Sequence, residues 1–218
     1  MDEKIKAFNA VAGKYDDWYE HPQGKQVFLA ERNVVNIMIP HEGLGLEVGS
    51  GTGAFIKSLE NEGRTIVGLD PSTEMIAQAK EKQIHSVLGY GHHAPFRTVF
   101  DFTYMVTVIE FLLDPVATLK EIRKITKTGS PYTLLFINKD SSWGTLYKDI
   151  GAKSDPVFKH ARLYSLSEIE EIVGRGGYKI CDTKGTLSSK PLSPDVDNVI
   201  TDPTRDSGVV VVKAVPRV

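Results

Sequence analysis

The sequence predicts an α/β fold in which a mostly parallel sheet is covered by helices on both faces. Short apolar segments alternate with amphipathic segments of about 10–15 residues, which is the pattern of consecutive β-α-β units. The apolar segments, such as residues 102–109, lack the polar alternation of a sheet with one face in water. Both faces of the sheet should therefore be buried.

The elements follow one another in this order through residue 138. Residues 3–39 are expected to be helical, and Pro40 ends them because proline cannot continue a helix. The expected strands are residues 44–48, 65–69, 85–88, 102–109 and 131–137. The expected helices are residues 54–62, with Gly63 as C-cap, residues 72–82, capped by Ser72 or Asp70, and residues 115–126.

The pattern changes after residue 138. The expected elements there are a polar, partly helical segment over 141–160, a helix over 165–174, and strands over 178–186 and 209–215. Ser165 and Glu168 form a capping box that begins the helix. Residues 187–207 make an unusually long loop, and such loops are either functional, here as a substrate cap, or mobile solvated excursions.

Composition excludes several classes of function. The chain has 218 residues, with 26 Lys plus Arg against 28 Asp plus Glu and a net charge of -2. This balance argues against a nucleic-acid partner, which usually requires a basic surface. The single cysteine, Cys181, excludes a disulfide framework and a multi-cysteine metal site, and we expect it to be an inert core residue.

The sequence also lacks the features of a membrane protein and of a secreted protein. No apolar run approaches the roughly 20 residues that a membrane span requires, and the charged start Met1-Asp2-Glu3-Lys4 does not resemble a secretory signal. We therefore expect a soluble cytoplasmic protein with no membrane span and no metal site, present as a monomer or homodimer.

The most informative segment is the glycine-rich turn over residues 46–53, between an expected strand and an expected helix. Glycines there allow a tight turn and a close approach of a ligand to the backbone. Gly49, Gly51 and Ala54 also satisfy a dinucleotide fingerprint, so a nicotinamide cofactor stays open. Glu47 suits a ligand with a cationic amino group better than a pyrophosphate.

Asp70 ends the next expected strand, where a carboxylate can accept both hydroxyls of a ribose. Together with residues 47–53, Asp70 resembles the first two motifs of the class I S-adenosylmethionine-dependent methyltransferases. The broad methyltransferase type 11 group, which includes ubiquinone- and menaquinone-biosynthesis enzymes, is the nearest likeness. Residues 89–96 resemble the adenine loop of that family, although Tyr90 stands where an acid is usual.

Three further segments resemble the same family, so that the likeness covers nearly all of residues 8–186. They are residues 8–19 at the N-terminal side, residues 127–130 before the fifth strand, and residues 162–178. Phe111 departs from the histidine that many quinone-type relatives carry, so their substrate does not transfer to this chain.

The resemblance implies a Rossmann-like, doubly wound, seven-stranded sheet, mostly parallel with one antiparallel strand near the C-terminus. It implies one domain over residues 1–218, with a helical lid over 1–40, a cofactor-binding core over 41–138, and late helices, loop and strands over 139–218. S-adenosyl-L-methionine is the implied cofactor and S-adenosyl-L-homocysteine the product. The expected acceptor is a small molecule, with no nucleic acid involved.

The resemblance also implies which residues contact the cofactor. They are Tyr15, Trp18, Tyr19, Glu47, Gly49, Ser50, Gly51, Thr52, Gly53, Asp70, Pro71, Met75, Tyr90, Gly91, His92, Thr107 and Val108. Asp70 would hold the ribose, Met75 would pack on adenine, and Thr107 would lie on the methyl side. Met75 could instead be plain core, and Trp18 could only fix the N-terminal helix to the domain.

Methyl transfer from a sulfonium is a direct displacement, so the enzyme mainly supplies proximity and orientation. A base is needed only if the acceptor must lose a proton. No catalytic residue is therefore assigned; His92, His93 and Glu110 are candidates, although Glu110 could simply face water. The residues suggested on the acceptor side are Phe111, His160 and Arg162, the last two of which could also form a solvated basic turn.

Two alternative functions stay open on the sequence alone. A nicotinamide-dependent oxidoreductase rests only on the overlapping glycine fingerprint. A non-catalytic S-adenosylmethionine-binding protein rests on Tyr90 in the adenine loop and on the absence of an obvious base.

Overall fold

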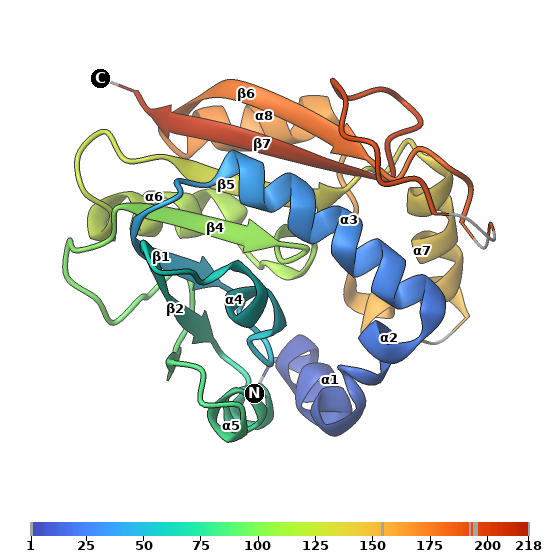
Figure 1. Ribbon diagram of the computed structural model, residues 1–218, viewed down its shortest axis with the longest axis horizontal. Helices are drawn as coiled ribbons and strands as arrows, with labels where there is room; N and C mark the ends of the chain where they lie inside the picture. The colour runs from blue at the N-terminus through green and yellow to red at the C-terminus, as the bar shows by residue number, and fades with distance from the viewer. Residues whose placement is uncertain (1, 154, 192, 194–195, 218) are drawn as a thin grey trace.

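The computed structural model describes residues 2–153, 155–191, 193 and 196–217. Seven strands form one sheet in the order β3-β2-β1-β4-β5-β7-β6 (Figure 1). The strands are β1 Gly43–Val48, β2 Arg64–Asp70, β3 Ser86–Leu88, β4 Phe102–Val106, β5 Tyr132–Ile137, β6 Tyr178–Thr186 and β7 Val209–Pro216. β1 to β5 pair in parallel, and β7 is antiparallel to both β5 and β6. The prediction of one antiparallel strand near the C-terminus is confirmed.

The helices are α1 Glu3–Val11, α2 Asp17–Glu20, α3 Pro22–Met38, α4 Ala54–Leu59, α5 Thr73–Glu81, α6 Pro115–Ile125, α7 Ser142–Ala152 and α8 Leu166–Arg175. Short 3₁₀ helices occupy Ala12–Lys14, Ile109–Phe111 and Phe158–His160. The expected continuous helix over 3–39 is therefore broken. Its main break is at His21, which is extended because Pro22 disfavours the helical conformation of the residue before it.

Each face of the sheet has its own apolar core. α3, α4 and α7 cover one face, and α6 and α8 cover the other (Figure 1). Both faces of β4 are buried, which explains why its sequence is nearly all apolar: Phe102 and Tyr104 pack toward α3 and α4, whereas Met105 packs toward α6. The described ranges contain no helix that combines the length and apolarity needed to cross a membrane.

Two expected boundaries are wrong. The helix expected over 54–62 ends at Leu59, because Glu60 is extended, and Gly63 is not its C-cap. The amide of Gly63 instead donates to Oδ1 of Asn61 at 2.9 Å, which forms a turn into β2. The strand expected over 102–109 ends at Val106, because the next residue takes a left-handed backbone conformation.

The expected core position of Cys181 is also wrong, because its side chain is exposed. The pairing of β6 with β7 shifts register between Ile180 and Asp182. This irregularity interrupts the inward and outward alternation that the sequence pattern assumes. Tyr178 and Ile180, before this shift, pack against the core under α6 and α8, so Cys181 already lies on the opposite side of the edge strand β6, where it is exposed.

The long loop over 187–207 is anchored in its described part; residues 192, 194 and 195 lie outside the described residues. Leu187 is buried, and Nε1 of Trp143 donates to the carbonyl of Ser189 at 2.8 Å. Gly185 and Thr201 pair as an isolated bridge. These contacts connect the described part of the loop to α7 and to β6. A mobile loop surrounded by solvent would not make such contacts.

The strand order reverses between β1 and β4, which are neighbours although β2 follows β1 in the chain. At such a point the loops after two adjacent strands run to opposite faces of the sheet and leave a crevice at the carboxyl edge. The glycine turn after β1 and residue 107 after β4 border this crevice. The fold therefore places the sequence-predicted motifs beside one another.

A buried arginine joins three segments at the opposite edge of the sheet. Arg64 is 2% exposed and donates through Nε to the carbonyl of Leu59 at 2.7 Å. Its Nη1 donates to the carbonyl of Pro40 at 2.9 Å, and its Nη2 to Oδ1 of Asn36 at 2.6 Å. One side chain thus connects α3, α4 and the start of β2.

Replacing this arginine tests that connection. Arg64→Met should lower the free energy of unfolding by about 2–4 kcal/mol, because the buried carbonyl of Leu59 and the partly buried carbonyl of Pro40 lose the donor that Arg64 supplies. Urea denaturation measures the loss. Arg97→Met, at an exposed position, is the control and should stay within about 0.5 kcal/mol of the native protein. An equally small effect of Arg64→Met would contradict the assignment.

Candidate functional site

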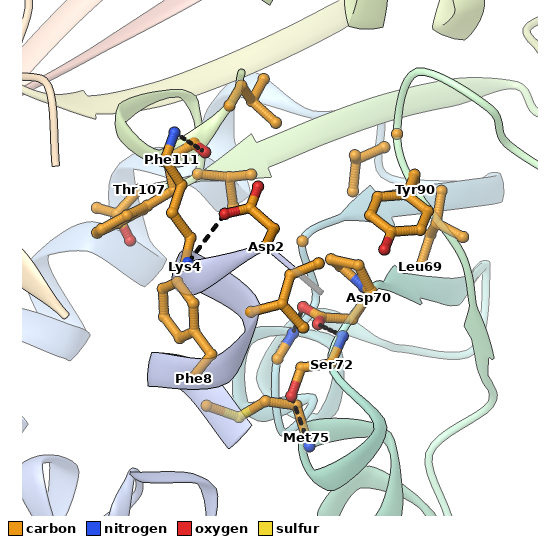
Figure 2. A pocket seen from close by; sticks show the side chains of 18 of the residues that line it. Asp2, Lys4, Phe8, Leu69, Asp70, Ser72, Met75, Tyr90, Thr107 and Phe111 are labelled. Carbon is orange, nitrogen blue, oxygen red and sulfur yellow. Dashed lines mark hydrogen bonds between the residues drawn. The ribbon is translucent and has the colours of Figure 1, made fainter. Parts of the chain in front are cut away.

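A cavity of about 340 Å³ lies at the carboxyl ends of β1, β2 and β4, and Figure 2 shows its walls. We call it the first cavity. Its lining residues are Asp2, Lys4, Ile5, Phe8, Tyr15, Val48, Gly49, Gly51, Leu69, Asp70, Pro71, Ser72, Met75, Tyr90, Gly91, His92, Val106, Thr107, Val108, Phe111, Leu112 and Leu113. Eleven of the residues expected to contact the cofactor are among them.

The glycine turn requires glycine for two separate reasons. Gly49 and Gly51 have φ values of 76° and 53°, in the left-handed region that other residues avoid. A Cβ on Gly49 would also lie 2.4 Å from a methyl group of Val108, so the two loops that border the crevice could not approach each other. At Gly51 a Cβ would meet nothing within 4 Å.

Asp70 is held at the end of β2 by two backbone amides. Its Oδ2 accepts from the amide of Gly51 and its Oδ1 from the amide of Ser72, both at 2.8 Å. Burial raises the pKa of Asp70 to about 6, and the two amides oppose that shift. Each carboxylate oxygen keeps a second lone pair, so Asp70 can still accept hydroxyl donors from the cavity.

An apolar region adjoins Asp70 in the first cavity (Figure 2). Met75 is 1% exposed and belongs to both the interior and the cavity wall, so its two expected roles are compatible. The rings of Tyr90 and His92 lie 5.4 Å apart on the same wall. A carboxylate beside a flat apolar region matches the ribose and the base of a nucleoside.

Four residues expected to contact the cofactor lie behind the cavity wall instead. Glu47, Ser50, Thr52 and Gly53 do not line the first cavity. Burial raises the pKa of Glu47 to about 8, and its carboxyl accepts from the hydroxyl of Tyr104 at 3.1 Å. The structure thus gives Glu47 a partner behind the glycine turn.

A second cavity, of about 350 Å³, adjoins the first and shares four of its wall residues: Phe8, Tyr15, Thr107 and Phe111. Its other lining residues are Val11, Trp18, Tyr19, Gln23, Val27, Glu31, Ile137, Trp143, Leu146, Tyr147, Ile150, Asp155, Pro156, Val157 and Phe158. Of the three aromatic residues expected as a lid over the cofactor, only Tyr15 reaches the first cavity. Trp18 and Tyr19 line the second.

Glu110 lies in neither cavity, although it was a candidate base. It is 1% exposed rather than facing water, and its Oε1 accepts from the amide of Ile137 at 2.8 Å. Its Oε2 has no hydrogen-bond partner among the described residues. Burial raises the pKa of Glu110 to about 7.

The remaining candidates lie outside both cavities. His93 is exposed, and neither His93 nor His160 is a lining residue. The guanidinium of Arg162 lies 4.9 Å from the ring centre of Tyr164 and 3.7 Å from a carboxylate oxygen of Glu168. Arg162 thus lies on the surface, in the segment before α8.

Several wall residues were not predicted from the sequence. Lys4 of α1 reaches across the first cavity, where its Nζ donates to the carbonyl of Phe111 at 2.9 Å (Figure 2). Glu31 lines the second cavity from α3. A signal for it exists, because Val27, Glu31 and Val35 recur every four residues and so share the apolar stripe of one helix.

Comparisons with known proteins agree with this geometry. The methyltransferase domain family Methyltransf_11 matches residues 46–133. The uncharacterized protein MJ1123 of Methanocaldococcus jannaschii is 30% identical over 176 residues, covering 80% of this chain and 82% of that protein. A structure from Thermotoga maritima, described as a possible histamine N-methyltransferase, has a TM-score of 0.86 at 26% identity and covers 98% of this chain and 100% of that chain. Magnesium protoporphyrin IX methyltransferase of Synechocystis, with bound S-adenosylhomocysteine, shares the fold, with a TM-score of 0.69 at 16% identity over 97% of each chain.

The chain belongs to the class I S-adenosylmethionine-dependent methyltransferases. It is therefore an enzyme whose cofactor is S-adenosylmethionine, and the nicotinamide and non-catalytic alternatives are set aside. The first cavity fits this cofactor on its own chemistry. Asp70 offers oxygen acceptors for a ribose, Met75 and Tyr90 offer apolar surface for a base, and the glycine turn leaves room beside the backbone.

The glycine turn generates a paired test. Gly49→Ala should reduce thermal stability more than Gly51→Ala, because both need a left-handed backbone but only the first brings a methyl group against Val108. Thermal denaturation measures both variants. Adding Val108→Ala to Gly49→Ala should recover part of the loss. Equal losses for the two single variants would show that the close approach of the loops is not limiting.

The buried carboxyl groups generate a pH prediction. Burial raises the pKa of Glu31 and Glu47 to about 8, of Glu110 to about 7 and of Asp70 to about 6. Above about pH 5, these carboxyl groups have lost their protons in the unfolded chain but keep them in the folded protein until the pH reaches the raised pKa values. Stability should fall as the pH rises from about 5.5 to about 8.5.

Melting temperatures across that range, without cofactor, provide the measurement. Glu47→Gln should flatten part of the decline, because the amide does not titrate. A stability that is constant or rises up to about pH 8.5 would contradict the raised pKa values.

Proposed function

We propose that the enzyme binds S-adenosylmethionine in the first cavity and transfers its methyl group to a small molecule in the second. The observation that carries this proposal is the wall that the two cavities share, formed by Phe8, Tyr15, Thr107 and Phe111. Donor and acceptor would come into contact where these four residues border both cavities, as direct displacement requires.

The protein's contribution would be binding, orientation and exclusion of water. Asp70 would accept the ribose hydroxyls, Met75 and Tyr90 would pack against adenine, and the glycine turn would pass beneath the methionine part. Thr107 and Val108 would face the methyl group. Bound S-adenosylmethionine supplies an electrophilic methyl group on a sulfonium centre.

The second cavity supports a small acceptor. Its volume of about 350 Å³ and its largely apolar walls, rich in aromatic residues, are typical of a small-molecule site. The net charge of -2 supports the same choice over a nucleic acid. The relative from Thermotoga maritima, described as a possible histamine N-methyltransferase, favours an amine among small acceptors.

The role of Asp70 tests where the cofactor binds. Asp70→Asn should weaken the binding of S-adenosylhomocysteine by about 10- to 100-fold, because the neutral amide loses charge-assisted acceptors for the ribose. Isothermal titration calorimetry measures the affinity. Asp206→Asn, which makes the same change at an exposed position, is the control and should leave the affinity unchanged.

Two outcomes would overturn the proposal. One is no measurable binding of S-adenosylhomocysteine to the native protein. The other is an Asp70→Asn protein that melts like the native one and binds S-adenosylhomocysteine equally well.

A further inference from the structure

The second cavity combines aromatic walls with one buried acid. Its aromatic residues include Tyr15, Trp18, Tyr19, Phe111, Tyr147 and Phe158. The rings of Tyr147 and Phe158 stack at 4.5 Å, and those of Tyr15 and Tyr19 meet edge to face at 6.1 Å. The faces of such rings attract cations through their negative electrostatic potential.

Glu31 is an acidic residue of the second cavity that has no evident structural role. It is 8% exposed, and among the described residues no group donates a hydrogen bond to its carboxyl and no Lys, Arg or His forms an ion pair with it. Buried polar groups normally have such partners, because leaving one unpaired is costly. An unpaired carboxyl that faces a cavity is therefore an available ligand group.

The other acid in the second cavity provides a contrast. Oδ1 of Asp155 accepts from the amides of Val157 and Phe158 at 2.9 and 2.8 Å, so Asp155 stabilises the turn that carries Phe158. The described lining contains no Lys, Arg or His. The cavity therefore favours cations over anions, and Glu31 is the carboxyl left to bind one.

We propose that the second cavity recognises an aliphatic amine with an aromatic or apolar body, and that Glu31 binds its amino group. This inference rests on the proposed function and names the acceptor class. The aromatic walls would enclose the body of the amine, while the Glu31 carboxylate would pair with the ammonium group. An alcohol of the same shape would gain the apolar contacts only.

The same carboxyl can take the proton that the ammonium must lose before it reacts. Burial, and then the nearby charge of Glu110, raise the pKa of Glu31 to about 8, so its ionised form, which accepts the proton, and its neutral form are both accessible near neutral pH. The other titratable groups that interact with Glu31 are the hydroxyls of Tyr15, Tyr19 and Tyr147, whose pKa values burial raises further above 10. They stay protonated where Glu31 titrates.

The reaction balances with these groups. The proton of the ammonium passes to the Glu31 carboxylate, which leaves a neutral amine and a neutral carboxylic acid. The lone pair of the amine nitrogen then forms a bond to the methyl carbon. The carbon–sulfur bond breaks at the same time, and the electron pair of that bond goes to sulfur. The products are a methylated ammonium and S-adenosylhomocysteine.

Matched ligands test the inference on the native enzyme. In the presence of saturating S-adenosylhomocysteine, calorimetry should show that phenethylamine binds at least about ten times more tightly than 2-phenylethanol, which has the same body and no charge. Equal affinity for the two ligands, or no binding of either, would overturn the amine assignment. Because S-adenosylhomocysteine binding is measured first, failure of the proposed function is seen separately.

Matched variants test the residue. Glu31→Gln keeps the shape of the side chain and should lose the preference for phenethylamine over 2-phenylethanol, while its affinity for S-adenosylhomocysteine stays within about two-fold. Glu42→Gln makes the same change at an exposed position before β1 and should keep the preference. A Glu31→Gln protein that still prefers the amine by about ten-fold would overturn the role of Glu31.

Discussion

The carboxylate of Asp70 is the group on which the arrangement of the first cavity depends. It accepts the amide of Gly51 in the glycine turn and the amide of Ser72 before α5. The hydroxyl of Ser72 donates in turn to Oδ1 of Asn9 on α1 at 2.6 Å. One chain of hydrogen bonds thus connects the turn after β1, the end of β2, the start of α5 and the helix over the cavity. A group that binds the ligand also orders the walls around it.

The shared wall depends on a residue in an unfavourable backbone conformation. Thr107 has a φ of 50°, which is costly for a β-branched residue, and its amide donates to the carbonyl of Leu135 at 3.0 Å. This conformation ends β4 and lets the chain turn into the 3₁₀ helix that carries Phe111. The border at which the two cavities meet is therefore fixed by the backbone as well as by side chains.

The sequence predicted the first cavity better than the second for a physical reason. Gly49 and Asp70 follow consecutive strands, and the order of strands and helices places such positions at one edge of a sheet. The second cavity is assembled by the packing of α1 to α3 against α7, which no local pattern encodes. Glu31 could be noticed only as an acid on an apolar stripe. Cys181 is exposed because it lies on the side of the edge strand β6 opposite to Tyr178 and Ile180, and the local pattern does not say which side the helices cover.

One helix borders both compartments. α1 contributes Phe8 to each cavity and is held across the first by the contact of Lys4 with the carbonyl of Phe111. Because the same helix borders both cavities, any displacement of α1 would change the shape of the two compartments at once. A substitution on its inner face would therefore be felt by the cofactor and by the acceptor together.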